Sequence, residues 1–185
     1  MNDNGAFLYN KYKNGDNDAL GEIVSLYSDN LLYFINGYVK NIHIAQDILS
    51  DTFFRLIISR KNFSEQSSFK TYLYRIARNL SLDYLRKQKR NKEISVSDEN
   101  TLQDEKQLEN AVVNNEQKKQ LALALQKLPD IYREALYLVY FENLSYKDTA
   151  KILKKNKKQT ENIIFRARQS LKKILVKEGF VYEEL

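Results

Sequence analysis

The stretch FKTYLYRIARNLSLDYLRKQKR, residues 69–90, predicts one helix with two chemically different sides. Its apolar residues recur at helical spacing and indicate a buried side. Its cations gather on the opposite side, where Tyr74 and Leu82 lie among them, and Asp83 is the one acidic residue in the stretch. The apolar side holds Phe69, Tyr72, Leu73, Ile76, Leu80 and Tyr84, and the cationic side holds Arg75, Arg78, Arg86 and Lys89.

The helix needs only its apolar side in order to fold, so the cationic side is not required for folding. A basic face with few acidic neighbours and interleaved aromatic rings suits a phosphate backbone and unstacked bases. An ordinary solvated amphipathic helix is the alternative, and this stretch by itself does not separate the two readings.

Composition favours a helical protein with an anionic partner. The chain has 185 residues, which suits one large or two small domains, and 43% of them are hydrophobic. Five Gly and one Pro leave few breaks and favour long helices joined by short polar turns. The formal net charge of +6 indicates nucleic acid before membrane, because no strong lipid-binding stretch is present.

Several kinds of chemistry are missing from the sequence. There is no cysteine, and no Gly-rich phosphate loop, nucleophile elbow or zinc-spaced cluster occurs. We therefore expect no catalytic residues, no metal site and no cofactor. The polar N-terminus, MNDNGAFLYNKYKNGD, lacks the apolar core of a signal peptide, and no apolar run approaches the roughly 18 residues that span a bilayer. A soluble cytoplasmic protein without membrane insertion is expected.

Charge divides the chain into three parts. Residues 1–90 hold 13 Lys and Arg against 9 Asp and Glu, and residues 116–185 hold 15 against 9. Residues 91–115 hold 2 against 6, with few large apolar side chains, which is a linker composition. We expect an all-α protein in which two small helical domains, 1–90 and 116–185, are joined by this acidic linker.

The first domain is expected to be helical throughout. Apolar spacing predicts helices over residues 18–35 and 44–59, separated by a polar break at residues 40–43. In the second of these helices, Ala45, Ile48, Leu49, Phe53, Leu56 and Ile57 form the expected core side. Residues 62–68, NFSEQSS, have loop composition and precede the helix that begins at Phe69.

The second domain is expected to contain a helix-turn-helix. A first apolar stripe ends at Pro129, and a helix over residues 131–141 follows. Ser145 with Asp148 three positions later resembles a capping box and opens a helix that ends at Leu153. The polar turn at residues 154–157 leads into a helix over residues 158–177.

A helix-turn-helix inserts its second helix into the major groove, with the N-terminal residues on base edges. Lys157, Lys158, Gln159 and Asn162 suit that place, since Gln and Asn can pair with adenine and Lys with guanine. The alternative is an ordinary helix pair with a basic surface, which is common in all-helical proteins.

A different surface is predicted on the helix over residues 44–59. Asp47, Ser50, Asp51 and Phe54 share a face that points away from Ile48, Leu49 and Phe53. Two carboxylates beside an exposed Phe are poor for DNA and good for a protein partner. A metal or acid–base site would need further ligands, and the single histidine, His43, lies before the helix.

These stretches together resemble the extracytoplasmic-function sigma factors of bacterial RNA polymerase. AQDILSDTFFRLI (45–57) resembles the helix with which that family binds core polymerase. SSFKTYLYRIARNLSLDYLRKQKR (67–90) resembles its promoter-melting and −10-reading helix. LPDIYREALYLVYFENLSYKDTAKIL (128–153) and FRARQSLKKIL (165–175) resemble its −35-reading domain. The acidic linker lies where this type of sigma factor lacks a middle domain.

The resemblance implies a role for each of these surfaces. The face of Asp47, Ser50, Asp51 and Phe54 would bind the polymerase clamp helices. The loop with Asn62, Ser67 and Ser68 would capture a flipped base of the non-template strand. The helix that tracks the −10 element would use Arg75, Arg78, Asn79 and Arg86. The −35-reading helix would use Lys158, Gln159, Asn162 and Arg166, beside Lys157.

The sequence also departs from the family pattern. Ser50 stands where many relatives have Gln, Thr149 replaces a usual Ile, and Thr160 replaces an apolar residue. Lys154 and Lys155 replace the usual Gly and apolar residue of the turn, so the exact register of the reading helix is open. A more basic turn indicates heavier reliance on phosphate contacts.

The expected function is that of a transcription initiation factor. It would bind core RNA polymerase, direct it to the −10 and −35 elements of promoter DNA and help melt the −10 region, without catalytic chemistry of its own. An anti-sigma factor is a further partner that the resemblance implies. The alternative function is a free-standing helix-turn-helix regulator that binds duplex DNA unaided, although such a regulator has no use for the acidic face at Asp47.

Overall fold

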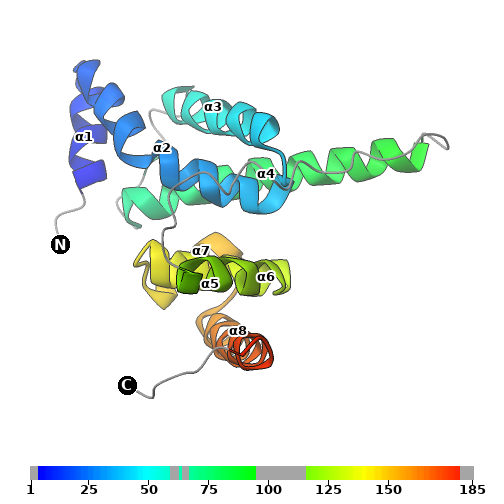
Figure 1. The fold of residues 1–185 in the computed structure, drawn as a ribbon. Coiled ribbons are helices and arrows are strands. Elements are labelled where there is room, and N and C mark those ends of the chain that lie inside the picture. Colours follow the sequence, from blue (N-terminus) through cyan, green and yellow to red (C-terminus); the bar gives the residue numbers. More distant parts are fainter. Residues whose placement is uncertain (1–3, 59–62, 64–66, 95–115, 180–185) are drawn as a thin grey trace. The chain divides into compact units, whose positions relative to one another are not determined.

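The computed structural model describes residues 4–58, 63, 67–94 and 116–179 of the chain. All regular elements in these ranges are helices, as the sequence predicts, and none of the described residues lies in a strand. The chain divides into two compact units, Met1–Glu105 and Lys106–Leu185 (Figure 1).

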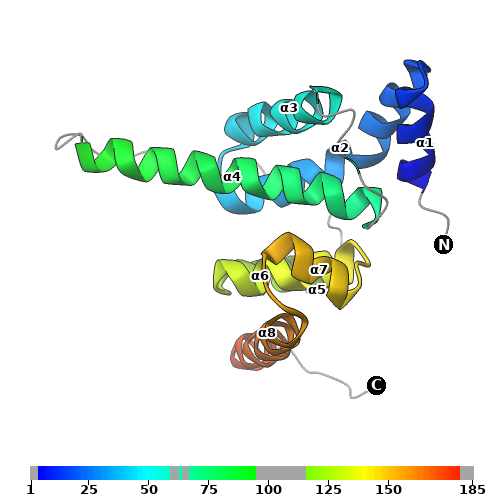
Figure 2. The same ribbon diagram turned by 180° about the vertical axis from the view of Figure 1, so that it is seen from behind.

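The first unit contains four helices: α1 (Asn4–Lys13), α2 (Asp18–Val39), α3 (Ile42–Ile58) and α4 (Phe69–Ile94). Helices α2, α3 and α4 pack against one another, and α1 lies against α2 and α4 (Figure 2). The C-terminal part of α4 extends beyond α2 and α3 in both views (Figure 1). Arg86, Lys87, Lys89 and Arg90, which lie in this part of the helix, are exposed.

The connection between α2 and α3 is short and capped on both sides. Lys40 ends α2 in the left-handed conformation, at φ 54°, and its N–H donates to the Asn36 carbonyl at 3.0 Å. The Asn41 side-chain oxygen accepts hydrogen bonds from the N–H groups of His43 and Ile44, at 3.0 and 3.1 Å. The predicted break at residues 40–43 is thus a tight turn, and His43 is an exposed residue of the first turn of α3.

Helix α1 was not predicted, because it is short, with ten residues, and carries little apolar pattern. It is held by aromatic side chains: the Tyr9 ring lies 5.1 Å from the Phe69 ring and 5.7 Å from the Phe63 ring, centroid to centroid. The Tyr9 hydroxyl also donates to the Leu56 carbonyl at 3.2 Å. Three buried apolar side chains, those of Leu8, Tyr9 and Tyr12, are too few to produce a clear apolar period in the sequence.

Helix α4 carries the predicted apolar side but is buried more broadly than its pattern indicates. Phe69, Tyr72, Leu73 and Leu80 are buried, and Ile76 and Tyr84 are half-buried. Tyr74, expected among the cations, is fully buried with its ring 5.0 Å from that of Phe34. The expectation for Tyr74 was wrong because α4 contacts all three other helices of the unit, and so its N-terminal half is covered on more than one side.

Helix α4 also continues to Ile94, four residues past the expected end of the domain at residue 90. Residues 91–94, assigned to the linker on composition, are therefore helical. The rest of the predicted linker, residues 95–115, lies outside the described residues.

The second unit contains α5 (Glu116–Gln126), α6 (Asp130–Leu136), the π-helix η2 (Tyr137–Phe141), α7 (Tyr146–Leu153) and α8 (Lys157–Lys177). Helix α8 packs against α5, α6 and α7. Four buried residues form part of the core of this unit: Leu125, Leu128, Leu136 and Ala167. Half-buried hydrophobic residues pack against them, namely Leu121, Tyr132, Leu171 and Ile174.

The helix predicted over residues 131–141 is present, but it changes from an α-helix to a π-helix along its length. Its last five residues form η2, in which the Glu142 N–H donates to the Tyr137 carbonyl at 3.1 Å. The wider turn places the Tyr137 and Phe141 rings nearly parallel, with centroids 5.5 Å apart. Hydrophobic spacing over so short a segment does not distinguish a π-turn from an α-turn.

Candidate protein and nucleic-acid interfaces

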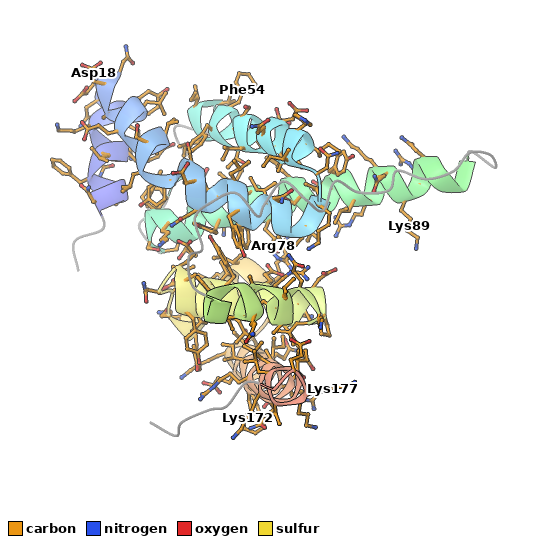
Figure 3. All side chains as sticks on the ribbon, viewed as in Figure 1. Asp18, Phe54, Arg78, Lys89, Lys172 and Lys177 are labelled. Atoms are coloured by element: carbon orange, nitrogen blue, oxygen red, sulfur yellow. The ribbon has the colours of Figure 1, made fainter. Side chains whose placement is uncertain are left out.

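The acidic and aromatic face of α3 is exposed as expected. Asp47, Ser50, Asp51 and Phe54 all lie at the surface, and the Phe54 side chain is 60% exposed (Figure 3). The Ser50 hydroxyl donates to the Gln46 carbonyl at 3.0 Å, which leaves it a weak group for binding a partner. The face therefore consists of two carboxylates beside one large apolar ring.

The opposite side of α3 is the core side, with two adjustments. Ala45, Ile48, Phe53 and Leu56 are buried, whereas Leu49 and Ile57 are only half-buried. Thr52 is fully buried and was not expected to be, but its hydroxyl donates to the Ile48 carbonyl at 2.7 Å. That bond removes the cost of burying a polar group.

Ile58 extends the exposed face by one turn, and the sequence pattern had not placed it there. It lies four residues after Phe54 and its side chain is 68% exposed. Its spacing of eleven from Asp47 was the available signal, since positions i, i+4, i+7 and i+11 fall on one side of a helix.

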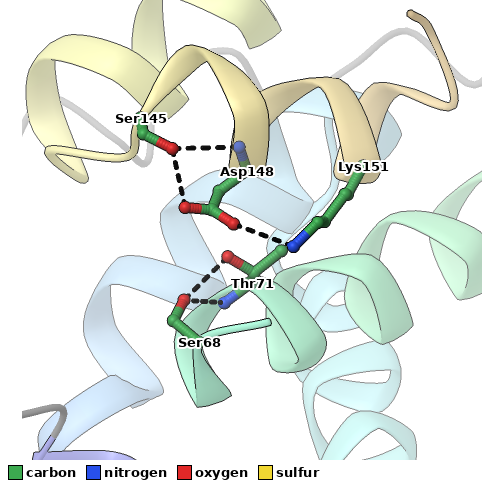
Figure 4. Close-up of polar contacts among 5 residues, drawn as sticks. All are labelled: Ser68, Thr71, Ser145, Asp148 and Lys151. Carbon is green, nitrogen blue, oxygen red and sulfur yellow. Dashed lines mark hydrogen bonds and ion pairs between the residues drawn. The ribbon is translucent and has the colours of Figure 1, made fainter. Parts of the chain in front are cut away.

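The start of α4 is fixed by Ser68, which was expected to contact a flipped base. The Ser68 hydroxyl oxygen accepts from the Thr71 N–H at 3.1 Å and lies 2.7 Å from the Thr71 hydroxyl (Figure 4). Ser68 therefore caps the helix in this structure. Ser67 is half-buried beside it, and Asn62 lies outside the described residues.

The cationic side of α4 is only partly as predicted. The half-buried Arg75 places its guanidinium 5.7 Å from the centre of the Tyr72 ring, and Asn79 follows one turn later. Arg86 is exposed and pairs with Asp83 at 3.0 Å. Arg78 is only 9% exposed, so the structure does not present it at the surface as the spacing predicted. Lys89, by contrast, is exposed on the extended end of the helix (Figure 3).

The first helix of the helix-turn-helix begins as predicted. The Ser145 hydroxyl oxygen accepts from the Asp148 N–H at 3.1 Å, so Ser145 is the N-cap of α7. The hydroxyl also donates to the Asp148 carboxylate at 2.7 Å, and that carboxylate pairs with Lys151 at 3.3 Å (Figure 4). Asp148 therefore supports the cap through its side chain.

The turn of the helix-turn-helix is one residue shorter than expected. Lys154 ends α7 in the left-handed conformation at φ 55°, which explains why Gly is usual at this place. Lys155 donates its N–H to the Ala150 carbonyl at 3.0 Å, and Asn156 is the N-cap of α8. Lys157, expected in the turn, is instead the first residue of the helix.

A capping box at the start of α8 was also missed. The Asn156 side-chain oxygen accepts from the Gln159 N–H at 2.8 Å, and Gln159 Oε1 accepts from the Asn156 N–H at 3.1 Å. The signal was in the sequence, because Asn followed three residues later by Gln is a variant of the capping-box pattern. The box fixes the position at which α8 begins.

The outer face of α8 is polar and basic. Lys157, Lys158, Gln159, Asn162 and Arg166 are all exposed, as predicted. Phe165, at 63% exposure, lies on the surface of α8 as well, and so does Glu161, which lies 3.8 Å from Lys157 in an ion pair. Lys172 and Lys177 continue the basic character towards the end of the helix (Figure 3).

No cluster of three or more His, Cys, Asp or Glu side chains suited to a metal ion occurs among the described residues. Within the same part of the chain, no helix has the length and apolar character needed to cross a membrane.

Known proteins resemble the chain in both units. A family model described as Sigma-70 region 2 matches residues 23–91, and one described as Sigma-70, region 4 matches residues 118–171. The ECF RNA polymerase sigma factor SigM of Bacillus subtilis (strain 168) is 35% identical over 160 residues, covering 83% of this chain and 93% of SigM. The chain belongs to the ECF sigma factors.

Further members agree with this assignment. The ECF sigma factor SigW of the same organism is 32% identical over 172 residues, covering 88% of this chain and 92% of SigW. The fold is also shared with solved structures. CnrH in complex with the cytosolic domain of CnrY matches with a TM-score of 0.68 at 22% identity, over 93% of this chain and 97% of that one. The sigma factor RpoE in complex with the anti-sigma factor NepR, from Bartonella quintana, matches with a TM-score of 0.66 at 24% identity, over 84% and 95%.

As an ECF sigma factor, the protein is a transcription initiation factor that directs RNA polymerase to promoters. The region 2 match contains the exposed face of α3 and nearly all of α4. The region 4 match contains the helix-turn-helix and most of α8.

Proposed function

We propose that the two domains divide promoter recognition between them. Residues 1–90 bind core polymerase and open the −10 region, residues 116–185 bind the −35 element, and the acidic residues 91–115 connect them. The observation that carries the proposal is the exposed acidic and aromatic face of α3, in the same domain as the cationic side of α4.

The α3 face suits a basic protein surface. Asp47 and Asp51 would repel a phosphate backbone, so this side of the domain is not a DNA surface. Phe54 offers a large apolar ring of the kind that anchors protein interfaces, and the carboxylates around it select a positively charged partner. Ile58 enlarges the apolar part of the contact.

The cationic side of α4 suits the −10 element. Arg75, Asn79 and Arg86 follow one side of the helix and track the strand backbone, and Arg78 joins them once it is uncovered. The loop of Asn62, Ser67 and Ser68 captures an extruded base. Extrusion costs a few kcal/mol of unstacking, which contacts of the loop with the base and of α4 with the phosphate backbone offset.

The exposed end of α8 suits duplex DNA. Lys157 and Lys158 contact phosphates, while Gln159, Asn162 and Arg166 reach base edges in the major groove. The chain needs no catalytic group, because the polymerase performs the synthesis, and it acts in the cytoplasm with that enzyme. We also expect an anti-sigma factor as a further protein partner.

Charge reversal on α3 tests the docking proposal. The double variant Asp47→Lys with Asp51→Lys should lose co-purification with core polymerase, because two attractive contacts become repulsive ones. Its helical content and thermal unfolding should stay unchanged, since both side chains are exposed and have no partner among the described residues. The matched control is Glu22→Lys with Asp29→Lys, the same charge change on an exposed side of α2.

Polymerase binding by the α3 variant at the level of the α2 control would contradict the proposal. A gel-shift assay on promoter DNA, with and without core polymerase, separates the alternative function. A free-standing regulator binds duplex tightly and specifically without polymerase, whereas the proposed factor requires it.

A further inference from the structure

The Gln159 side chain is exposed, yet its amide oxygen already accepts a hydrogen bond. It lies on the outer face of α8, yet its Oε1 accepts the backbone N–H of Asn156 at 3.1 Å. The assignment of the oxygen is chemically forced, because a backbone N–H donates to the amide oxygen and not to the amide nitrogen. The reciprocal bond, from the Gln159 N–H to the Asn156 side-chain oxygen, is 2.8 Å long.

The other end of this amide is available. Nε2 carries two hydrogens, and none of the described residues accepts a hydrogen bond from it. In the capping box the oxygen therefore turns back to the helix end and the NH₂ group is left to meet a ligand. Oε1 keeps a second lone pair, but its bond to the Asn156 N–H holds it towards the helix end, so the oxygen and the NH₂ group do not project together.

Adenine and guanine differ in how they can pair with this NH₂ group in the major groove. Adenine shows an N7 acceptor beside an N6 donor, so a glutamine pairs with it only when its oxygen and its NH₂ project together. Guanine shows two neighbouring acceptors, O6 and N7, and needs donors alone. An NH₂ group without its oxygen also meets a second donor at adenine N6, which is unfavourable.

We propose that Gln159 reads a guanine of the −35 element through its NH₂ group, and that the capping box with Asn156 excludes the adenine pairing otherwise typical of glutamine. The inference rests on the proposed role of α8 at the −35 element. It makes Asn156 a positioning residue, which acts on specificity by holding the Gln159 side chain and not by touching DNA.

Binding of the full chain with core polymerase to single-base promoter variants tests the inference. A genomic fragment that this complex transcribes supplies the promoter, and each −35 position is changed to all four base pairs. Comparison with Gln159→Ala identifies the base pair that depends on Gln159. The wild-type complex should favour guanine over adenine there by at least about fivefold, within the range of specific base contacts, and Gln159→Ala should remove the preference.

Three further variants separate the NH₂ group from the helix cap. Gln159→Glu keeps an acceptor for the Asn156 N–H, as Glu does in the usual capping box, but has no donor and should lose the guanine preference. Asn156→Ala and Asn156→Pro both lose the side-chain cap, but only Pro also loses the backbone N–H. The φ of Asn156, −78°, already suits Pro.

Asn156→Ala should keep the guanine preference, whereas Asn156→Pro frees the Gln159 oxygen and should shift the preference towards adenine. Circular dichroism and polymerase binding check that each variant folds. Adenine favoured by the wild type, no base pair dependent on Gln159, or equal preferences in Asn156→Ala and Asn156→Pro would each overturn the inference alone. Failure of the wild-type complex to discriminate any −35 sequence would overturn the proposed function and the inference with it.

Discussion

Two buried threonines of the helix-turn-helix differ in how their hydroxyl groups are satisfied. Thr149 in α7 and Thr160 in α8 are both fully buried, at positions where the family pattern has apolar residues. The Thr160 hydroxyl donates to the Asn156 carbonyl at 3.0 Å. The Thr149 hydroxyl has no hydrogen-bond partner among the described residues. A buried hydroxyl without a partner costs stability, whereas a bonded one does not.

Valine at each position separates these two cases, because it has nearly the shape of threonine without the hydroxyl. Thr149→Val should raise the free energy of unfolding by about 1 kcal/mol, since an unsatisfied polar group is removed. Thr160→Val should leave it unchanged or lower it by up to about 1 kcal/mol, since a hydrogen bond is lost. Thermal unfolding of the full-length variants, followed by circular dichroism, measures the difference. A larger gain for Thr160→Val than for Thr149→Val would contradict this account.

The packing of α1 depends on a glycine whose neighbours leave no space. A β-carbon at Gly5 would overlap the Tyr27 hydroxyl and the Phe69 ring, which lie on α2 and α4. A β-carbon at Gly21, in the first turn of α2, would meet nothing within 4 Å. The first glycine is therefore required by close approach between helices, and the second is not.

Alanine should accordingly have opposite effects at these two positions. Gly5→Ala should lower the free energy of unfolding by about 1–3 kcal/mol, because α1 must move away from the aromatic core. Gly21→Ala should raise it by about 0.5–1 kcal/mol, because alanine is the better helix former and has room. Thermal unfolding again gives the readout. If Gly5→Ala is as stable as Gly21→Ala, then α1 does not pack as closely as the structure shows.

At the scale of elements, periodicity predicted most helices and missed the short helix α1. The α3, α4, α7 and α8 helices follow long or well-capped patterns, and their positions were predicted within a few residues. Helix α1 was missed because its stability comes from ring contacts with Phe63 and Phe69, which are distant in sequence. Such tertiary contacts leave no local period.

The candidate site was predictable where exposure follows from spacing alone. The α3 face lies opposite an apolar stripe, so the exposure of Asp47 and Asp51 could be deduced from the sequence. Arg78 could not be placed in this way, because a single helix pattern does not reveal how many neighbours cover it. The role of Gln159 in capping α8 was visible as a motif but was overlooked in favour of base contact.

At the scale of the whole molecule, charge alternates along the chain in a way that fits its proposed task. The two helical domains carry net charges of +4 (13 − 9) and +6 (15 − 9), and residues 91–115 between them carry −4 (2 − 6). The basic domains are suited to promoter DNA. The acidic stretch avoids that DNA and is suited to a basic channel that otherwise holds nucleic acid.

The length of the connection between the domains is the last testable feature. Because α4 continues to Ile94, at most 21 residues (95–115) separate the last described residue of the first unit from the first of the second. Fully extended, a stretch of that length reaches about 70–75 Å. Two promoter elements about two helical turns apart are separated by roughly 70 Å. The connection therefore has little length to spare.

Deleting ten residues within 95–115 should abolish promoter-specific transcription, because the remaining chain reaches only about 40 Å. Both domains should stay folded, with unchanged helical content and with polymerase binding retained through α3. A variant in which the same ten residues are replaced by Gly and Ser keeps the reach and loses the acidic charge. Activity retained in the replacement and lost in the deletion would assign the effect to length, and loss in both would assign it to charge. Full run-off transcription by the deletion variant would show that the two domains do not contact the −10 and −35 elements together, and the proposed division of promoter recognition would then be wrong.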